Sequence, residues 1–475
     1  MTAHWVSILA LVVVFAVSTT MSVNMGALSF AAALLVGTTV AGLTAEEIFT
    51  TFPGSIFVVL VGVTYLFAIA RATGTVDWLV ASAVHLVRGR LSLIPWVMFG
   101  VAGVLTSIGA VSPAAVAIVA PIALRLAAKH HISPLLMGAL VVTGAQAGGF
   151  SPISVYGAIV NDVLANEKVP GNEITLFLAS LLVNSAVAAV MYLVCGGLRL
   201  RRAEPAIAGA PQPSPASAAD GSSSDPGARS ATAAATKAEG STAPTAEAST
   251  SAATKVETSA VEDVDATTST KAEERIPLNR ERIATLAGLA VLVLTTLLLE
   301  ADVGLMAITV AVVLGFVAPG AHRSAVNEVT WPTVLLICGV LTYVGVMEQM
   351  GTIEYVGKAV AGVGAPLVAA LLICLIGAIV SAFASSVGVL GALIPLAVPL
   401  LAGSEIGPLG MIAALAVAST VVDISPFSTN GAIVLANARD TDRERFFRQL
   451  MVLGGVIVVT APVVVWLAFV VPSWG

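Results

Sequence analysis

Apolar runs long enough to cross a lipid bilayer recur along this chain of 475 residues. A transmembrane helix needs about 17–25 predominantly apolar residues. Charged residues make up 11% of the chain. A soluble domain carries about 25%, so most of this surface must face lipid. The sequence therefore predicts an all-α integral membrane protein with about ten transmembrane helices. Full spans are predicted at residues 5–21, 25–43, 54–71, 174–198, 283–299, 304–317, 332–350 and 450–471.

The composition also excludes some classes of function. The net charge of −6 provides no basic field for nucleic acid. Cys195, Cys338 and Cys374 lie singly within apolar stretches, without metal-binding or redox spacing, and are interpreted as small packing residues. We therefore expect no cofactor and no resident metal.

Four further apolar regions are interrupted. Two are too long for one span and are broken near the middle by small residues, at 107–113 and 381–388, which predicts re-entrant helical hairpins. Two others are interrupted by the sequences GGFSPIS and DISPFSTN, which predicts broken helices. Non-helical backbone at membrane depth is tolerated only where protein or water satisfies it, so these interruptions are candidate functional sites. The hairpins are predicted at residues 93–126 and 365–401, and the broken helices at 134–164 and 408–437.

Residues 203–274 have a different composition. They are rich in Ala, Ser and Thr and contain no aromatic residue and no Leu. Such a segment cannot bury enough apolar surface to offset the entropy of ordering. It is predicted to be a disordered linker between an N-terminal membrane repeat, 1–202, and a C-terminal one, 275–475.

The two membrane halves repeat each other. Residues 107–160 align with 381–434 at a constant offset of 274, with Pro121 opposite Pro395. A re-entrant hairpin returns to its own side and does not count as a crossing. The four full spans and the broken helix of each half therefore make five crossings, which is an odd number. The second half then starts on the opposite side, which predicts inverted repeats, an arrangement common in secondary transporters.

The Lys and Arg residues beside the spans predict the orientation. If the linker is cytoplasmic, most of these residues, including Arg88, Arg201 and Arg282, face the cytoplasm, and only Lys168 and Lys358 face outward. We therefore expect a multi-pass protein of the cell membrane with both termini external.

The hairpin tips and helix breaks supply candidate binding residues. Helix N-termini favour anions, and exposed carbonyl ends favour cations such as Na⁺. The two tips and two breaks are expected to converge near the bilayer midplane and to hold a small organic anion there. The hydroxyl and amide groups predicted to line this site are those of Ser112, Ser151, Ser154, Ser385, Ser386, Ser425, Ser428, Thr429 and Asn430.

Asp423 is the one acidic residue well inside a predicted membrane segment. Intramembrane acids are costly and usually functional, so Asp423 is predicted to bind the Na⁺ or H⁺ that drives transport. Ser107 and Ser381, where the hairpin tips begin, are assigned to the same ion. The alternative is that Asp423 caps the broken helix or faces a cytoplasmic vestibule. Its repeat equivalent is Gly149, so any coupling role is asymmetric.

The motifs SPISVYGAIV and SPFSTNGAIVLAN, each downstream of a hairpin, resemble a known group. They are similar to the dicarboxylate carrier MatC-like (malonate carrier) proteins of the ion transporter superfamily, which has the divalent anion/sodium symporters as relatives. The resemblance covers both membrane halves and excludes the linker. It implies a homodimer working by an elevator-type movement, in which hairpins and broken helices slide against a fixed scaffold.

The motifs also depart from those of the symporters. Each symporter tip carries Ser-Asn-Thr, where this chain has residues 111–113 and 385–387, and only Ser385 agrees in type. Each symporter break carries Thr-Pro-Pro-Asn, where this chain keeps the Pro at 152 and 426 but has Ser for Thr and for Asn. In the symporters these Asn and Thr side chains contact the substrate carboxylates, so the scaffold carries over better than the substrate or the ion.

The first expectation is therefore a transporter for a C3–C4 dicarboxylate such as malonate, malate or succinate, coupled to Na⁺ or H⁺. The alternative on the same scaffold is a cation/proton antiporter or an oxyanion exporter. An intramembrane enzyme is the rival from another class. It would need a His, a pair of acids or a metal site within the membrane, and every His lies outside the predicted spans.

Overall fold

The computed structural model describes residues 2–200 and 278–472, apart from 22, 87–89, 167–168, 170, 199, 300, 362–365, 384–385, 403–405 and 439–441. The predicted linker, 203–274, lies outside the described residues, so the domain boundaries remain predictions. The described part is helical and contains no β-strand. Eight of its helical segments are long and apolar enough to cross a membrane, and shorter apolar helices accompany them.

The two halves contain corresponding helices in the same order. The predicted spans, hairpins and broken helices all appear as helices, and the short helices α3, α5, α14 and α16 lie between them. The first half consists of α1 (Thr2–Thr20), α2 (Met25–Thr39), α3 (Ala45–Thr50), α4 (Gly54–Ala72), α5 (Thr75–Leu86), α6 (Ile94–Ser107), α7 (Ser112–Lys129), α8 (Pro134–Gly148), α9 (Val155–Asn166) and α10 (Glu173–Val194). The second consists of α12 (Arg280–Leu299), α13 (Val303–Val317), α14 (Pro319–Ala325), α15 (Trp331–Gln349), α16 (Thr352–Ala361), α17 (Pro366–Phe383), α18 (Ser386–Ala402), α19 (Pro408–Val421), α20 (Thr429–Asn437) and α21 (Arg443–Val465).

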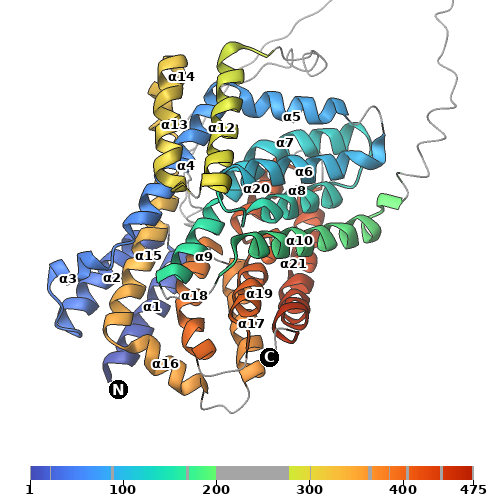
Figure 1. Ribbon diagram of the computed structural model, residues 1–475. Coiled ribbons are helices and arrows are strands. Elements are labelled where there is room, and N and C mark those ends of the chain that lie inside the picture. The colour runs from blue at the N-terminus through green and yellow to red at the C-terminus, as the bar shows by residue number, and fades with distance from the viewer. Residues whose placement is uncertain are drawn as a thin grey trace, which may run out of the picture.

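The helices form two groups, which we call the scaffold and the core unit. The scaffold comprises α1–α4 and α12–α15, and the core unit comprises α6–α10 and α17–α21. In Figure 1 most of the scaffold lies to the left and most of the core unit to the right. Two connecting helices join the groups, because α5 packs against α6 and α16 packs against α18. The two groups also pack directly on each other, α4 against α9 and α15 against α18.

Glycines allow the scaffold helices of the two halves to cross closely. Helix α2 crosses α15, and a Cβ added at Gly339 would lie 2.1 Å from the carbonyl oxygen of Gly26. Helix α4 crosses α13 in the corresponding way, where a Cβ at Gly62 would lie 2.5 Å from the carbonyl oxygen of Gly304. Small residues at such crossings permit the backbone contact that associates membrane helices. At each of these two crossings, one helix comes from the first half of the chain and the other from the second half.

We expect Gly339→Ala to destabilise the protein by about 1–3 kcal/mol, because the new methyl group overpacks the crossing of α2 and α15. The measurement is the thermal unfolding midpoint of the purified protein in detergent. Gly455→Ala is the matched control, because a Cβ at Gly455 meets nothing within 4 Å. An unchanged midpoint for Gly339→Ala would contradict the tight crossing.

The core unit is built around the two broken helices. In α8 every side chain from Leu136 to Gly148 is buried, and in α19 every side chain from Met411 to Val421 is buried. The hairpin helices pack against them, α6 and α7 on α8, and α17 and α18 on α19. Helix α8 ends at Gly148 and α9 begins at Val155, whereas α19 continues into a 3₁₀ turn, Val422–Ile424, before α20. The interruptions thus lie in the centre of the molecule.

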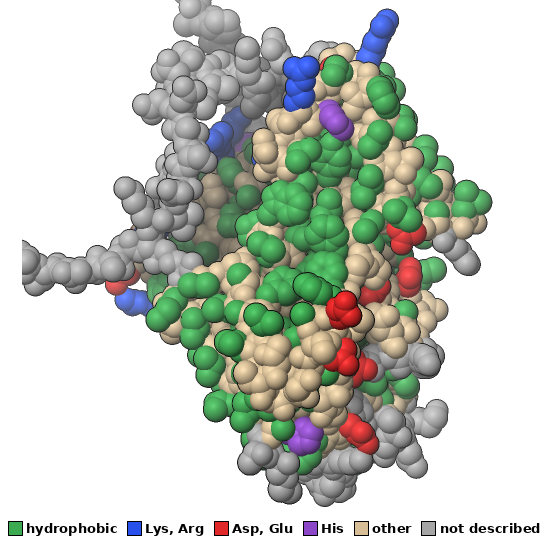
Figure 2. Space-filling model, turned by 90° about the vertical axis from the view of Figure 1, so that its left-hand side faces the viewer, with side chains coloured by type: hydrophobic (Ala, Val, Ile, Leu, Met, Phe, Trp, Pro, Cys, Tyr) green, Lys and Arg blue, Asp and Glu red, His purple; other side chains and the backbone are tan. Residues whose placement is uncertain are grey.

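The surface carries the apolar residues expected of a membrane protein. Large exposed hydrophobic side chains lie on α1, α10, α12, α13, α17 and α21, including Phe316 on α13 and Leu182 on α10. Figure 2 shows hydrophobic side chains over much of one face, with Lys and Arg towards its top and left edges and Asp and Glu in its lower right part. Exposed apolar surface on this scale is what a bilayer covers. The chain is therefore a multi-pass membrane protein.

Candidate functional site

A buried carboxylate lies where the helix interruptions meet. Asp423 belongs to the 3₁₀ turn that follows α19. Its Oδ1 atom accepts a hydrogen bond from the Ser386 hydroxyl at 2.5 Å. Its Oδ2 atom accepts from Gln146 Nε2 at 2.5 Å and from Asn430 Nδ2 at 3.2 Å. Three side chains from three other helices therefore converge on one carboxylate.

Two more serines extend this network. The amide of Asn430 also donates to the Ser112 hydroxyl at 2.9 Å, and Ser381 donates to Ser386 at 2.9 Å. Ser112 and Ser386 are the first residues of α7 and α18, so they belong to the two hairpin tips. We call these residues the Asp423 cluster: Ser112, Gln146, Ser381, Ser386, Asp423 and Asn430.

The Asp423 cluster joins all four interrupted elements. Ser112 comes from the first tip, and Gln146 comes from the last turn of α8, before the first break. Ser386 comes from the second tip, and Asp423 and Asn430 flank the second break. The convergence expected from the sequence is present among these side chains.

The cluster is closed to solvent in this structure. Asp423 is 5% exposed, and Gln146 and Asn430 are 0% exposed. No Lys, Arg or His forms an ion pair with Asp423 among the residues that the structure describes. A buried charge without an oppositely charged partner is unfavourable, and three hydrogen-bond donors offset only part of that cost. Asp423 therefore needs either a proton or a bound cation to be stable in this position.

Two amide oxygens in the cluster also lack partners. Gln146 Oε1 and Asn430 Oδ1 are buried and accept no hydrogen bond, because each amide presents its NH₂ group to Asp423. Buried polar atoms are nearly always satisfied in proteins, so two unpaired oxygens beside one buried carboxylate are candidate ligands for an ion.

The serines in the breaks hold the backbone. Ser154 accepts from the Gly157 amide and donates to the Gly149 and Ser151 carbonyls, so it caps α9. Ser428 does the same for α20, accepting from the Gly431 amide and donating to the backbone carbonyl of Asp423 at 2.5 Å. Both hydroxyls are already occupied as helix caps.

The other predicted residues have different surroundings. Ser151 donates to the Ser107 carbonyl at 2.6 Å, which ties the first break to the first tip, and Ser107 donates to the Gly148 carbonyl at 3.4 Å. Ser425 accepts from the Phe427 amide at 3.3 Å. The side chain of Thr429 is exposed and does not reach the cluster. Ser385 lies outside the described residues.

Helix α7 presents an N-terminus to the cluster without a side-chain cap. The residue that precedes it, Val111, is 5% exposed and makes no capping hydrogen bond. The first amides of a helix carry partial positive charge and need acceptors. Pro113 has no N–H, and the Ala114 amide already bonds to the Val111 carbonyl at 2.9 Å, so the amide and hydroxyl of Ser112 are the donors that this end of α7 can offer an anion.

No sequence motif marks Gln146 as a candidate. It lies in the motif GAQAGG within an apolar helix, and its repeat equivalent is Thr420, so the repeat did not mark it. The available signal was a large amide side chain in a buried transmembrane helix, which needs polar partners.

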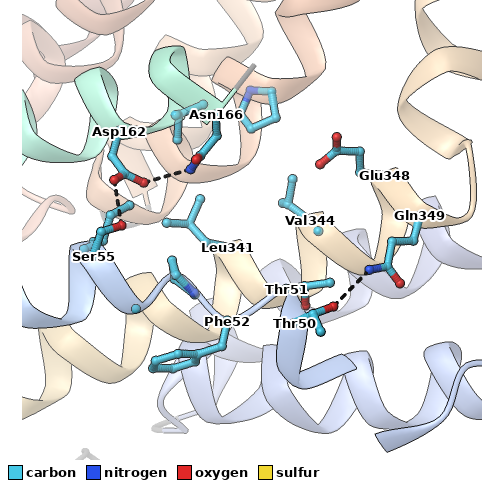
Figure 3. A pocket seen from close by; sticks show the side chains of 16 residues that line it. Thr50, Thr51, Phe52, Ser55, Asp162, Asn166, Leu341, Val344, Glu348 and Gln349 are labelled. Atoms are coloured by element: carbon cyan, nitrogen blue, oxygen red, sulfur yellow. Dashed lines mark hydrogen bonds between the residues drawn. The ribbon is translucent and has the colours of Figure 1, made fainter. Parts of the chain in front are cut away.

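A separate cavity of about 500 Å³ lies between the scaffold and the core unit (Figure 3). Ser55 of α4 donates to Asp162 Oδ1 at 2.7 Å, and Asn166 donates to Asp162 Oδ2 at 2.9 Å. On the scaffold side Gln349 donates to Thr50 at 3.4 Å. The cavity is lined by residues of α15, by the segment that joins α3 to α4, by α9 and by Pro395 of α18. The cavity therefore marks the boundary between the two groups of helices.

The first third of the chain matches a known family model. Residues 1–149 match the dicarboxylate carrier protein MatC N-terminus. The resemblance to MatC-like carriers is thereby confirmed over α1–α8, which include the first hairpin and Gln146. A search of the curated proteins finds no match.

A solved structure shares the fold. The YdaH transporter of Alcanivorax borkumensis, whose topology is described as unusual, superposes with a TM-score of 0.55 at 17% sequence identity. The match covers 90% of this chain and 89% of that one. At this identity the likeness concerns the fold alone, and it extends across both membrane halves.

Proposed function

We propose that the protein is a secondary active transporter for a small organic anion, a C3–C4 dicarboxylate such as malonate, malate or succinate. The observation that carries the proposal is the Asp423 cluster, which brings two hairpin tips and two helix breaks to one buried place. The MatC match over residues 1–149 supports a dicarboxylate as the cargo. The halves are proposed to be inverted, with the linker in the cytoplasm and both termini outside.

Helix ends and neutral polar groups would hold the anion. The amide and hydroxyl of Ser112, at the positive end of α7, supply donors for one carboxylate, and Asn430 lies beside them. An ionised Asp423 opposes this binding, because two like charges roughly 5 Å apart repel by about 3 kcal/mol at an effective dielectric constant of about 20. A Na⁺ or H⁺ at Asp423 removes that repulsion, so cation and anion bind together.

The movement is proposed to be of the elevator type. The core unit holds the cluster, and it contacts the scaffold through the pairs α4–α9 and α15–α18. Helices α5 and α16 connect the two groups and can follow a displacement. The scaffold is proposed to form the contact of the homodimer that the family resemblance implies, because it stays fixed while the core unit moves.

The test is uptake into proteoliposomes of labelled malonate, malate, succinate and citrate, under separately imposed Na⁺ and proton gradients. We expect saturable uptake of at least one C3–C4 dicarboxylate that one gradient drives. A cation/proton antiporter is the second candidate, because Asp423 alone could exchange ions. It would instead show cation-driven proton movement with no anion present, and the absence of dicarboxylate uptake under every gradient would contradict our proposal.

Asn430→Ala is expected to lower dicarboxylate uptake about tenfold, because it removes the amide that joins Ser112 to Asp423. Ser428→Ala is expected to act through stability, since loss of a helix cap costs about 1 kcal/mol. Uptake per correctly inserted protein separates the two effects. Thr460→Ala on the exposed side of α21 is the control. Normal uptake by Asn430→Ala would exclude this amide from the site.

A further inference from the structure

The unpaired oxygens of the Asp423 cluster lie close together. The NH₂ groups of Gln146 and Asn430 both reach the same atom, Asp423 Oδ2. The nitrogen and oxygen of an amide are bonded to the same carbon. Each unpaired oxygen is therefore separated from the nitrogen that contacts Asp423 Oδ2 by no more than one amide group. Both side chains are 0% exposed, and each leaves its oxygen without a partner.

A half-turn of each amide exchanges its nitrogen and oxygen. This rotation changes the shape of the side chain little, because the two ends of an amide are almost the same size. After it, Gln146 Oε1 and Asn430 Oδ1 would face the carboxylate, and three oxygen atoms would surround one point. Ser386 lies next to this point, where its hydroxyl oxygen can add a further ligand.

Three oxygens around one point suit a hard cation better than a proton. A proton on Asp423 can donate to one oxygen only, whereas a cation contacts several at once. The charge of the ion follows from the single carboxylate. A monovalent ion makes the buried site neutral, whereas a divalent ion would leave a net positive charge without a partner.

We infer that Asp423, Gln146 and Asn430 form a binding site for one dehydrated monovalent alkali cation, and that the two amides turn their oxygens inward when it binds. The ligands come from both halves of the chain, Gln146 from the first and the other two from the second. This order of binding rests on the proposed function: the cation fills this site before the anion binds at Ser112. The binding of the cation itself does not depend on which anion is carried.

Equilibrium binding of ²²Na⁺ to the purified protein in detergent, with no anion present, tests this site. Wild type is expected to bind one Na⁺ saturably, and Asp423→Asn to bind it about a hundredfold more weakly, because the charge is lost. Gln146→Leu is expected to weaken binding about tenfold, whereas Gln146→Glu, which keeps an oxygen at that position, retains it.

The chain offers a matched control in Asn184. Its amide is also 0% exposed with an unpaired Oδ1, but its nitrogen bonds to Ser180 rather than to Asp423. Asn184→Leu is therefore expected to bind Na⁺ as wild type does. Monodisperse elution in size-exclusion chromatography shows that each variant is folded, and competition by Li⁺ and K⁺ in the wild type gives the ion preference without any substitution.

The outcomes separate the cation site from the proposed function. If wild type binds no alkali cation saturably, or if Asn184→Leu weakens binding as much as Gln146→Leu, the inferred site is wrong. Proton release on Na⁺ addition that vanishes in Asp423→Asn would support it. Saturable Na⁺ binding without dicarboxylate uptake would leave the cation site in place and contradict the proposed cargo.

Discussion

Asp423→Asn should abolish the dependence of uptake on the driving ion. The asparagine amide has the same shape as the carboxylate but cannot carry a negative charge. Residue 423 can then no longer bind the Na⁺ or H⁺ that would accompany the anion. Gradient-driven uptake is expected to fall about a hundredfold, because the driving ion no longer contributes. The measurement is proteoliposome uptake of labelled dicarboxylate with and without the imposed gradient.

Exchange of internal for external anion separates coupling from folding. We expect Asp423→Asn to retain some exchange, since the hydroxyls and helix ends remain. Asp302→Asn is the control, because Asp302 caps α13 in the scaffold and an asparagine can keep that hydrogen bond to Leu305. Asp423→Asn uptake that still follows the ion gradient would remove Asp423 from the coupling mechanism.

Linking the core unit to the scaffold should stop transport. Ser55 of α4 and Asp162 of α9 meet at 2.7 Å across the boundary cavity, which leaves room for a short reagent. Cysteines at these two positions, in a variant without the three native cysteines, would be joined by a cleavable bis-thiosulfonate. Uptake is expected to fall to background, about a hundredfold, and to return on reduction, because the crosslink prevents the core unit from moving relative to the scaffold.

The same cavity provides the control for this crosslink. Thr50 and Gln349 both belong to the scaffold and lie 3.4 Å apart through their hydrogen bond. Cysteines at these positions, joined by the same reagent, should leave uptake intact because no moving boundary is crossed. Full transport by the crosslinked Ser55/Asp162 pair would mean that the two groups of helices do not slide at this boundary.

The sequence predicted the elements of the fold well, because span length and apolar composition leave few alternatives in a bilayer. The hairpin and break positions followed from the interruptions of the apolar runs, which recur at an offset of 274, and α6–α9 and α17–α20 appear there. The scaffold crossings were not predictable in the same way. The pairs Gly26–Gly339 and Gly62–Gly304 join residues far apart in the chain, and one sequence contains no signal of such a contact.

The sequence predicted which interrupted elements would meet, but not which of their side chains meet. Hydroxyl groups next to breaks satisfy backbone as readily as they bind ligands, and Ser154 and Ser428 do the former. Gln146 was not predictable from motifs that the two halves share, because the Asp423 cluster is asymmetric. Asp423 corresponds to Gly149 and Gln146 to Thr420, so only one carboxylate and one glutamine occur. The inferred cation site therefore has no counterpart at the repeat-equivalent positions, Gly149 and Thr420.

Access of position 112 from the two sides of the membrane tests the central claim most directly. Ser112→Cys, in a variant without native cysteines, is treated with a membrane-impermeant thiol reagent added outside or inside oriented proteoliposomes. We predict modification from either side, with protection by Na⁺ and dicarboxylate together, because one buried site alternates between the two aqueous phases. Modification from one side only, whatever ions and anions are present, would contradict a transport site formed by the Asp423 cluster.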